Sequence, residues 1–125
     1  NKDILSSNVK IIEYDMNTKF TNNEFFDIII SNPPYLDHSK KGEIDENVNF
    51  EPHIALFAPE GNPLHFYKQI LVFANKNLNK GGQIYLEINP DFIKEFNGLL
   101  TKFKPNDVNF RVDFRGKKRL AKLSF

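Results

Sequence analysis

Four consecutive residues, Asn32-Pro33-Pro34-Tyr35, combine polar and rigid groups directly after an apolar run from Phe26 to Ile30. Neither proline has a backbone N–H group and both have a fixed φ, while Asn32, which precedes a proline, is restricted to extended conformations. The turn therefore offers two hydrogen-bond acceptors, the Asn32 side-chain oxygen and the Pro33 carbonyl oxygen, beside the ring of Tyr35. This combination suits a planar NH₂ group, such as a carboxamide or a nucleobase amine.

Such a turn could hold both hydrogens of an NH₂ group while Tyr35 packs against the face of the group. The nitrogen lone pair would then be free to attack an electrophile. Acceptors directed at a nitrogen that becomes positive stabilise the transition state more than the ground state. The alternative is a plain strand that ends in a proline turn, because a short motif needs its structural context.

The apolar run before Asn32 must position this turn. A short run of β-branched residues closed by prolines is typical of a strand that is buried on both faces of a parallel sheet. In open α/β sheets, ligands bind beyond the carboxyl ends of the strands. Asn32 to Tyr35 would occupy that place, with Pro34 as part of the substrate-binding turn.

A second strand is predicted from Asn8 to Tyr14, and it ends at Asp15-Met16. Residues 17–24 are too few for a parallel crossover to the next strand. We therefore expect Val9–Tyr14 either to pair antiparallel with a neighbour or to pack on another copy of the chain. The exposed edge of the strand that begins at Phe26 is a possible site of self-association.

The second half of the chain predicts two helices, a strand and a closing hairpin. Asn62-Pro63 is typical of a helix start, and Gly81-Gly82 of its end. A buried strand follows at Gln83–Ile88, and Asn89-Pro90 opens the second helix. Apolar residues recur at helical spacing in both helices, at Leu64, Tyr67, Ile70, Leu71, Ala74 and Leu78, then at Phe92, Ile93, Phe96, Leu99, Leu100 and Phe103.

Alternation at Val108–Phe114 and at Ala121–Phe125 predicts two strands of a β-hairpin around Arg115-Gly116-Lys117-Lys118. The basic cluster around this turn, Arg111, Arg115, Lys117, Lys118 and Arg119, is either a solvated hairpin tip or a contact for an acidic or RNA-containing partner. The charged stretch Leu36–Phe50, with His38, is either a lid, a partner-binding surface or a plain mobile loop.

Composition limits the classes of function. The 125 residues are 40% hydrophobic and 26% charged, which suits one soluble domain (1–125) with a modest core. The absence of Cys excludes disulfides and thiolate metal sites and fits a reducing compartment, the cytoplasm. No apolar run could span a membrane and no secretory signal is present. A net charge of +1 gives no general field for nucleic acid. His53 and His65 lack metal-ligand spacing, so no metal site is predicted.

Asn-Pro-Pro-Tyr after such a strand resembles the catalytic motif of class I, S-adenosylmethionine-dependent amino methyltransferases. Further motifs follow in an order that is similar to the HemK/PrmC family, which methylates a glutamine amide of peptide chain release factors. These motifs are Glu51-Pro52-His53-Ile54-Ala55-Leu56 (E-P-x-x-A-L), Tyr67-Lys68-Gln69-Ile70 (Y-[RK]-x-I), Leu78-Asn79-Lys80-Gly81-Gly82 (L-x-x-G-G), Leu86-Glu87-Ile88 (L-E-I) and Asp113 to Arg119 (D-x-x-G-x-x-R).

The resemblance implies an α/β fold, a partial Rossmann-like class I methyltransferase sheet with a C-terminal β-hairpin. The family's first strands and its Gly-rich cofactor loop are missing, because the first glycine is Gly42. We therefore expect the chain to be the C-terminal part of a longer enzyme and to be inactive alone. The resemblance also implies that Asp15 accepts a hydrogen bond from the adenine amino group of S-adenosyl-L-methionine. Met16 would border the ring, and Asn32 would contact both cofactor and substrate.

Three functions remain open from the sequence. The first is methyl transfer to a release-factor glutamine, with Asn32, Pro33 and Tyr35 as catalytic residues and S-adenosyl-L-homocysteine as product. A second is an amino methyltransferase that acts on adenine or guanine of nucleic acid, or on a ribosomal-protein glutamine. A third is a non-catalytic fold fragment or association module.

Overall fold

The computed structural model describes residues 9–36, 52–59 and 61–125. Residues 37–50 of the stretch predicted to be a lid, a partner-binding surface or a mobile loop, with His38, lie outside these ranges, as does Glu51 of the E-P-x-x-A-L motif. The strands are β1 (Phe26–Ser31), β2 (Leu78–Glu87), β3 (Asp107–Val112) and β4 (Lys118–Ser124). The helices are α1 (His53–Leu56), α2 (His65–Asn77), the 3₁₀ helix η4 (Pro90–Phe92) and α3 (Ile93–Phe103).

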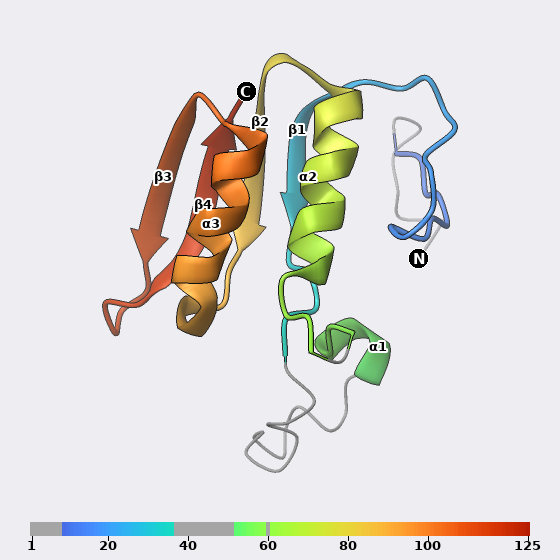
Figure 1. The fold of residues 1–125 in the computed structure, drawn as a ribbon. Coiled ribbons are helices and arrows are strands. Elements are labelled where there is room, and N and C mark those ends of the chain that lie inside the picture. The colour runs from blue at the N-terminus through green and yellow to red at the C-terminus, as the bar shows by residue number, and fades with distance from the viewer. Residues whose placement is uncertain (1–8, 37–51, 60) are drawn as a thin grey trace.

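The described strands form one mixed sheet in the order β1-β2-β4-β3 (Figure 1). β1 and β2 are parallel, with Ile29 beside Ile84. β4 lies antiparallel to both β2 and β3, so β3 and β4 make the predicted hairpin. The α/β class and the hairpin are confirmed, and the arrangement is compatible with a partial Rossmann-like sheet.

Helices α2 and α3 cover one face of the sheet (Figure 1). Their apolar sides pack on alternate residues of the strands, as the pleat of a sheet requires. The predicted helical stripes are therefore confirmed as core, except for Phe92, which is only partly buried and does not belong to the core cluster. The fully buried large side chains are Tyr67, Leu71, Ile84, Leu86, Ile88, Phe96 and Leu123.

The prediction that the β1 strand is buried on both faces is wrong. Ile29 packs against the core, whereas Ile28 and Ile30 are 55% and 78% exposed. The described helices cover only the Ile29 side, so the alternate residues of β1 face solvent. β1 is also an edge strand of the sheet.

The predicted strand at Val9–Tyr14 is also wrong, because these residues form no regular element. The segment is instead fixed at points along its length. Lys10 forms an ion pair with Glu24 at 2.5 Å, and the Tyr14 ring meets Phe20 edge-on at 5.2 Å. A strand needs a neighbour to bond its backbone, and β1 in the described ranges pairs only with β2.

Helix α2 differs from its prediction at both ends. It begins at His65 rather than at Pro63, because residues 62–65 make a separate turn, with the His65 N–H bonded to the Asn62 carbonyl at 3.1 Å. It ends at Asn77, and β2 starts at Leu78, so Gly81-Gly82 lie within β2 rather than after the helix. Gly82 is needed there, because a Cβ atom would lie 2.6 Å from Leu78 Cγ.

The start of the second helical segment follows its prediction. The Asn89 side chain accepts a hydrogen bond from the Asp91 N–H at 3.0 Å, which caps η4, and α3 continues from Ile93. No helix in the described ranges is long and apolar enough to cross a lipid bilayer.

Candidate active site at the carboxyl end of β1

The Asn32–Tyr35 turn lies directly after β1 and borders a hollow. Leu36 joins this turn to the segment after α1, with its N–H bonded to the Leu56 carbonyl at 3.0 Å and its carbonyl to the Ala58 N–H at 3.1 Å. The hollow has a volume of about 280 Å³. It is lined by Asn32, Pro33, Pro34, Tyr35, Leu36, Ala55 and Leu56.

Asn32 and Pro33, the residues that carry the two predicted acceptors, both line this hollow. Asn32 is exposed, and no hydrogen bond within the described ranges uses its carboxamide. Pro33 is buried and fixes the backbone beside it. The Asn32 amide is therefore available to a ligand instead of being bonded to the main chain.

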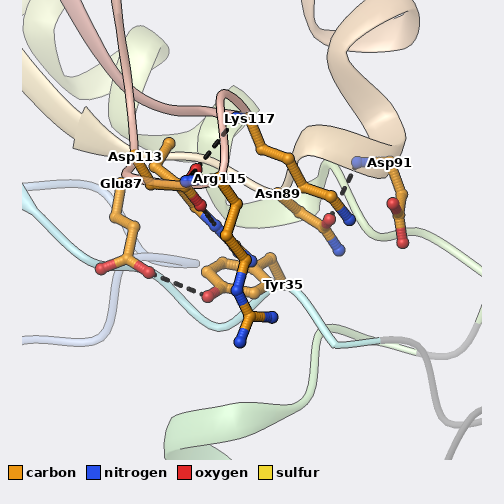
Figure 2. Close-up of polar contacts among 8 residues, drawn as sticks. Tyr35, Glu87, Asn89, Asp91, Asp113, Arg115 and Lys117 are labelled. Carbon is orange, nitrogen blue, oxygen red and sulfur yellow. Dashed lines mark hydrogen bonds and ion pairs between the residues drawn. The ribbon is translucent and has the colours of Figure 1, made fainter.

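The Tyr35 side chain is anchored at its far end. Its hydroxyl donates a hydrogen bond to Glu87 Oε1 at 3.0 Å, at the end of β2 (Figure 2). Partial burial raises the pKa of Tyr35, and the hydrogen bond and negative charge of Glu87 raise it further, against the opposing charge of Arg119. The phenol is therefore protonated at neutral pH and acts as the donor.

Tyr67 supports this region from the core. Its hydroxyl accepts a hydrogen bond from the Asn89 N–H at 3.2 Å. Its ring packs edge-on against Phe96 at 5.3 Å, and Tyr35 packs against the same core. Burial raises the pKa of Tyr67, so it too stays neutral.

Asp113 organises the turn of the β3–β4 hairpin. Its Oδ1 accepts the backbone N–H groups of Arg115 at 2.8 Å and of Lys117 at 2.9 Å (Figure 2). Its Oδ2 lies 3.3 Å from Nε of Arg119. These bonds, that of Lys117 first, lower the pKa of Asp113. Part of the predicted basic cluster is therefore ordered around one carboxylate.

The fold brings the Asn32–Tyr35 turn and the L-E-I motif to the carboxyl end of the parallel strands, whereas the L-x-x-G-G motif lies at the opposite end, where β2 starts. Sequence reasoning quoted Glu87 and Asp113 only as parts of motifs, and it placed Arg119 in the basic cluster without a role in this site. The sequence did contain a signal that Glu87 has a role, because it is a charged residue between apolar residues of a predicted buried strand. The residues that line the hollow or interact with Tyr35 are Asn32 to Tyr35, Leu36, Ala55, Leu56, Tyr67, Glu87 and Arg119.

Of the two predicted cofactor residues, Met16 lines a different, smaller hollow of about 40 Å³ beside α2, and Asp15 is not among its lining residues. Asp15 Oδ1 accepts both the backbone N–H and the side-chain amide of Asn17, at 2.8 and 2.9 Å. Asn17 Oδ1 in turn lies 2.5 Å from Nε2 of His65, the first residue of α2. This contact holds the turn at the carboxyl end of the parallel strands, where Asn32 also lies.

These residues fit S-adenosyl-L-methionine only in part, because they offer a hydrogen-bond acceptor but no pocket of sufficient size. Asp15 is exposed, and its second carboxylate oxygen takes no part in the bonds to Asn17. Met16 packs against the core. A hollow of about 40 Å³ is far smaller than ordinary ligand pockets, so the described residues here do not enclose a ligand of that size.

No family model matches the chain, but similar curated proteins agree with one another. A release factor glutamine methyltransferase of Flavobacterium psychrophilum is 42% identical over 82% of the chain and 36% of its own length. That of Bacteroides thetaiotaomicron is 38% identical over 76% of the chain and 34% of its own length. That of Lactococcus lactis is 36% identical over 96% of the chain and 44% of its own length. The chain thus spans less than half the length of each. Over the matched residues the chain is similar to proteins named release factor glutamine methyltransferase, which supports a fragment of the HemK/PrmC family.

Proposed function

We propose that the chain is the substrate-binding part of an S-adenosylmethionine-dependent methyltransferase that modifies the side-chain amide of a glutamine in a peptide chain release factor. One observation carries this proposal: Asn32, whose carboxamide has no partner in the described ranges, lines a hollow together with an anchored Tyr35. The relatives named above add support, because each is named for this reaction.

The size of the hollow favours a side-chain amide as the group that is bound. At about 280 Å³, it is just below the usual range for pockets that hold whole small ligands. Asn32 Oδ1 and the Pro33 carbonyl oxygen accept the two N–H bonds of the amide, and the Tyr35 ring fixes its plane. This leaves the nitrogen lone pair directed away from the acceptors.

When bound, S-adenosyl-L-methionine supplies a sulfonium methyl group, and S-adenosyl-L-homocysteine leaves with the electron pair of the broken C–S bond. As the C–N bond forms, positive charge develops on the amide nitrogen, and the two acceptors stabilise this charge. Alkylation makes that nitrogen acidic, so its proton can pass to water. The described residues that line the hollow include no carboxylate or histidine, and the reaction requires none.

The cofactor side of the site belongs to the same proposal. Asp15 accepts the adenine amino group through its second carboxylate oxygen, and Met16 borders the ring. Asn32 lies between the two ligands. Because the described residues here do not enclose a ligand of that size, we expect the 125-residue chain alone to bind the cofactor weakly and to be inactive, and the activity to belong to a longer protein that acts in the cytoplasm.

The test uses the longer protein that contains this chain. It is incubated with methyl-labelled S-adenosyl-L-methionine and, separately, with a release factor, a ribosomal protein and RNA. We expect label in the release factor, located by tandem mass spectrometry on one glutamine side chain and lost when that glutamine is replaced by alanine. Label in RNA with none in protein would overturn the proposed substrate. Absence of label from all three would overturn the proposed reaction.

A further inference from the structure

Glu87 is an acidic residue in an otherwise apolar stretch of chain. Its neighbours Leu86 and Ile88 are each 1% exposed, whereas Glu87 is half-buried at the end of β2. A partly buried carboxylate loses solvation and needs a hydrogen-bond partner. In the described ranges this partner is the Tyr35 hydroxyl, at 3.0 Å.

A positive charge lies beside this pair. The Ile88 N–H bonds to the Arg119 carbonyl at 2.8 Å, which places Arg119 next to the end of β2. Its side chain is held by Asp113 at 3.3 Å, and its charge acts on Tyr35 against that of Glu87. The hairpin turn therefore holds a fixed cation near the Tyr35–Glu87 pair.

The position of the Tyr35 ring affects the shape of the hollow. The ring is one wall of it, together with Asn32 and Pro33. A tyrosine has two side-chain torsions, and a bond at its hydroxyl restricts both when the ring already packs on the core. Without Glu87, the hydroxyl loses its partner and the ring can turn into the hollow or away from it.

We propose that Glu87 is a positioning residue: its carboxylate holds the Tyr35 hydroxyl so that the ring remains the wall against which the substrate amide is held. The statement about the amide rests on the proposed function, whereas the statement about the ring does not. Glu87 touches no reacting atom in this scheme and acts through Tyr35.

The first experiment follows the ring in the 125-residue chain by NMR with ¹³C-labelled tyrosine. The Tyr35 signal is assigned with Y35F. Because Glu87 raises the pKa of Tyr35, both E87Q and E87A should lower this pKa, and E87A, which also removes the acceptor, should change the ring signals. E95Q, which alters an exposed glutamate on α3, serves as the matched control and should change neither. An unchanged Tyr35 in E87Q would overturn the proposal, and this near-isosteric variant keeps the test valid if E87A fails to fold.

The second experiment measures methyl transfer by the longer protein. We expect E87A to lower kcat by about 10-fold to 100-fold with a smaller change in KM, because a misoriented amide slows the chemical step. E87Q should recover part of this loss, since its side-chain oxygen can still accept the Tyr35 hydroxyl. In a Y35F background, E87A should have little further effect, because the two residues act as one unit. An equal loss in both backgrounds would overturn the positioning role.

The two experiments separate the two proposals. If the wild-type protein transfers no methyl group to glutamine while E87Q still shifts the Tyr35 titration, the proposed function fails and the anchoring of the ring by Glu87 is supported. If transfer occurs and E87A leaves kcat unchanged, the proposed function stands and the role of Glu87 is overturned.

Discussion

Two turns at the same end of the sheet, residues 15–18 and 32–35, use their polar side chains in different ways. Asp15 accepts two hydrogen bonds from Asn17 of its own turn. Asn32 is exposed and makes no side-chain hydrogen bond within the described ranges, and it borders a hollow. A polar side chain that bonds its own turn contributes to the fold. Asn32 is followed by two prolines, which offer its side chain no backbone N–H group, so it stays available to a ligand.

The comparison predicts its largest effect at Asn32. In the longer protein, N32A should lower kcat for glutamine methylation by about 100-fold to 1,000-fold, the usual loss when one preorganised group that stabilises developing charge is removed. N97A, at an exposed position of α3, is the matched control and should keep wild-type rates. Full activity of N32A in a single-turnover assay would remove Asn32 from the catalytic account.

The next effect concerns Asp15 and the cofactor. D15A in the longer protein should raise the Kd for S-adenosyl-L-methionine by about 10-fold to 100-fold, the equivalent of one hydrogen bond to a charged group, and should leave kcat at saturation nearly unchanged. Isothermal titration calorimetry measures this, with D107A at the exposed start of β3 as control. Equal affinity in D15A and wild type would reduce Asp15 to a turn residue.

A smaller effect concerns the free energy of unfolding. Here the substitution in the Asp15 turn should have the larger effect and that at Asn32 the smaller one. D15A should lower the free energy of unfolding of the chain by about 1 kcal/mol, because a backbone N–H and a side-chain amide lose their acceptor. N32A should change it by less than about 0.5 kcal/mol, as is usual for exposed groups without partners. Urea unfolding followed by circular dichroism gives both values. A larger loss in N32A than in D15A would break the comparison.

The smallest predicted effect lies in the hairpin turn, where Asp113 resembles Asp15 in serving its own backbone. Hydrogen bonds, that from the Lys117 N–H first, lower the pKa of Asp113 in the folded state. Its contribution to stability is therefore fully present above the pKa of the unfolded chain and is lost as the pH falls through the lower, folded value. Thermal unfolding of wild type and D113N should differ at neutral pH and converge in strong acid. A gap that widens with acidification would contradict this assignment.

Much of the fold follows from local patterns. The alternation at Val108–Phe114 and Ala121–Phe125 predicts the hairpin, and the stripe from Phe92 to Phe103 predicts α3, because each pattern matches one secondary-structure period. Asn89-Pro90 predicts the start of η4 because capping chemistry is local.

The errors arise where an element depends on distant partners. The residues 9–14 have strand-forming side chains but no neighbouring strand in the described ranges. The apolar character of β1 does not reveal that Ile28 and Ile30 are uncovered. Gly81-Gly82 are typical of a helix end, yet here they allow β2 to bend past Leu78.

The same limit applies to the candidate site. The chemistry of Asn32, Pro33 and Tyr35 can be read from their order, because fixed φ angles and missing donors are local properties. The Tyr35–Glu87 bond joins residues 52 positions apart, and only the sheet brings them together. Likewise, only the fold determines whether the turns at Asp15 and Asn32 are close enough to bind cofactor and substrate side by side.

The most direct test of the central claim is a crystal structure of the longer protein with S-adenosyl-L-homocysteine and a glutamine-containing peptide of a release factor. The account predicts that the glutamine NH₂ group lies about 2.9 Å from both Asn32 Oδ1 and the Pro33 carbonyl oxygen, with the Tyr35 ring against its face. A peptide bound elsewhere, or a glutamine amide with no contact to Asn32 or Pro33, would contradict it.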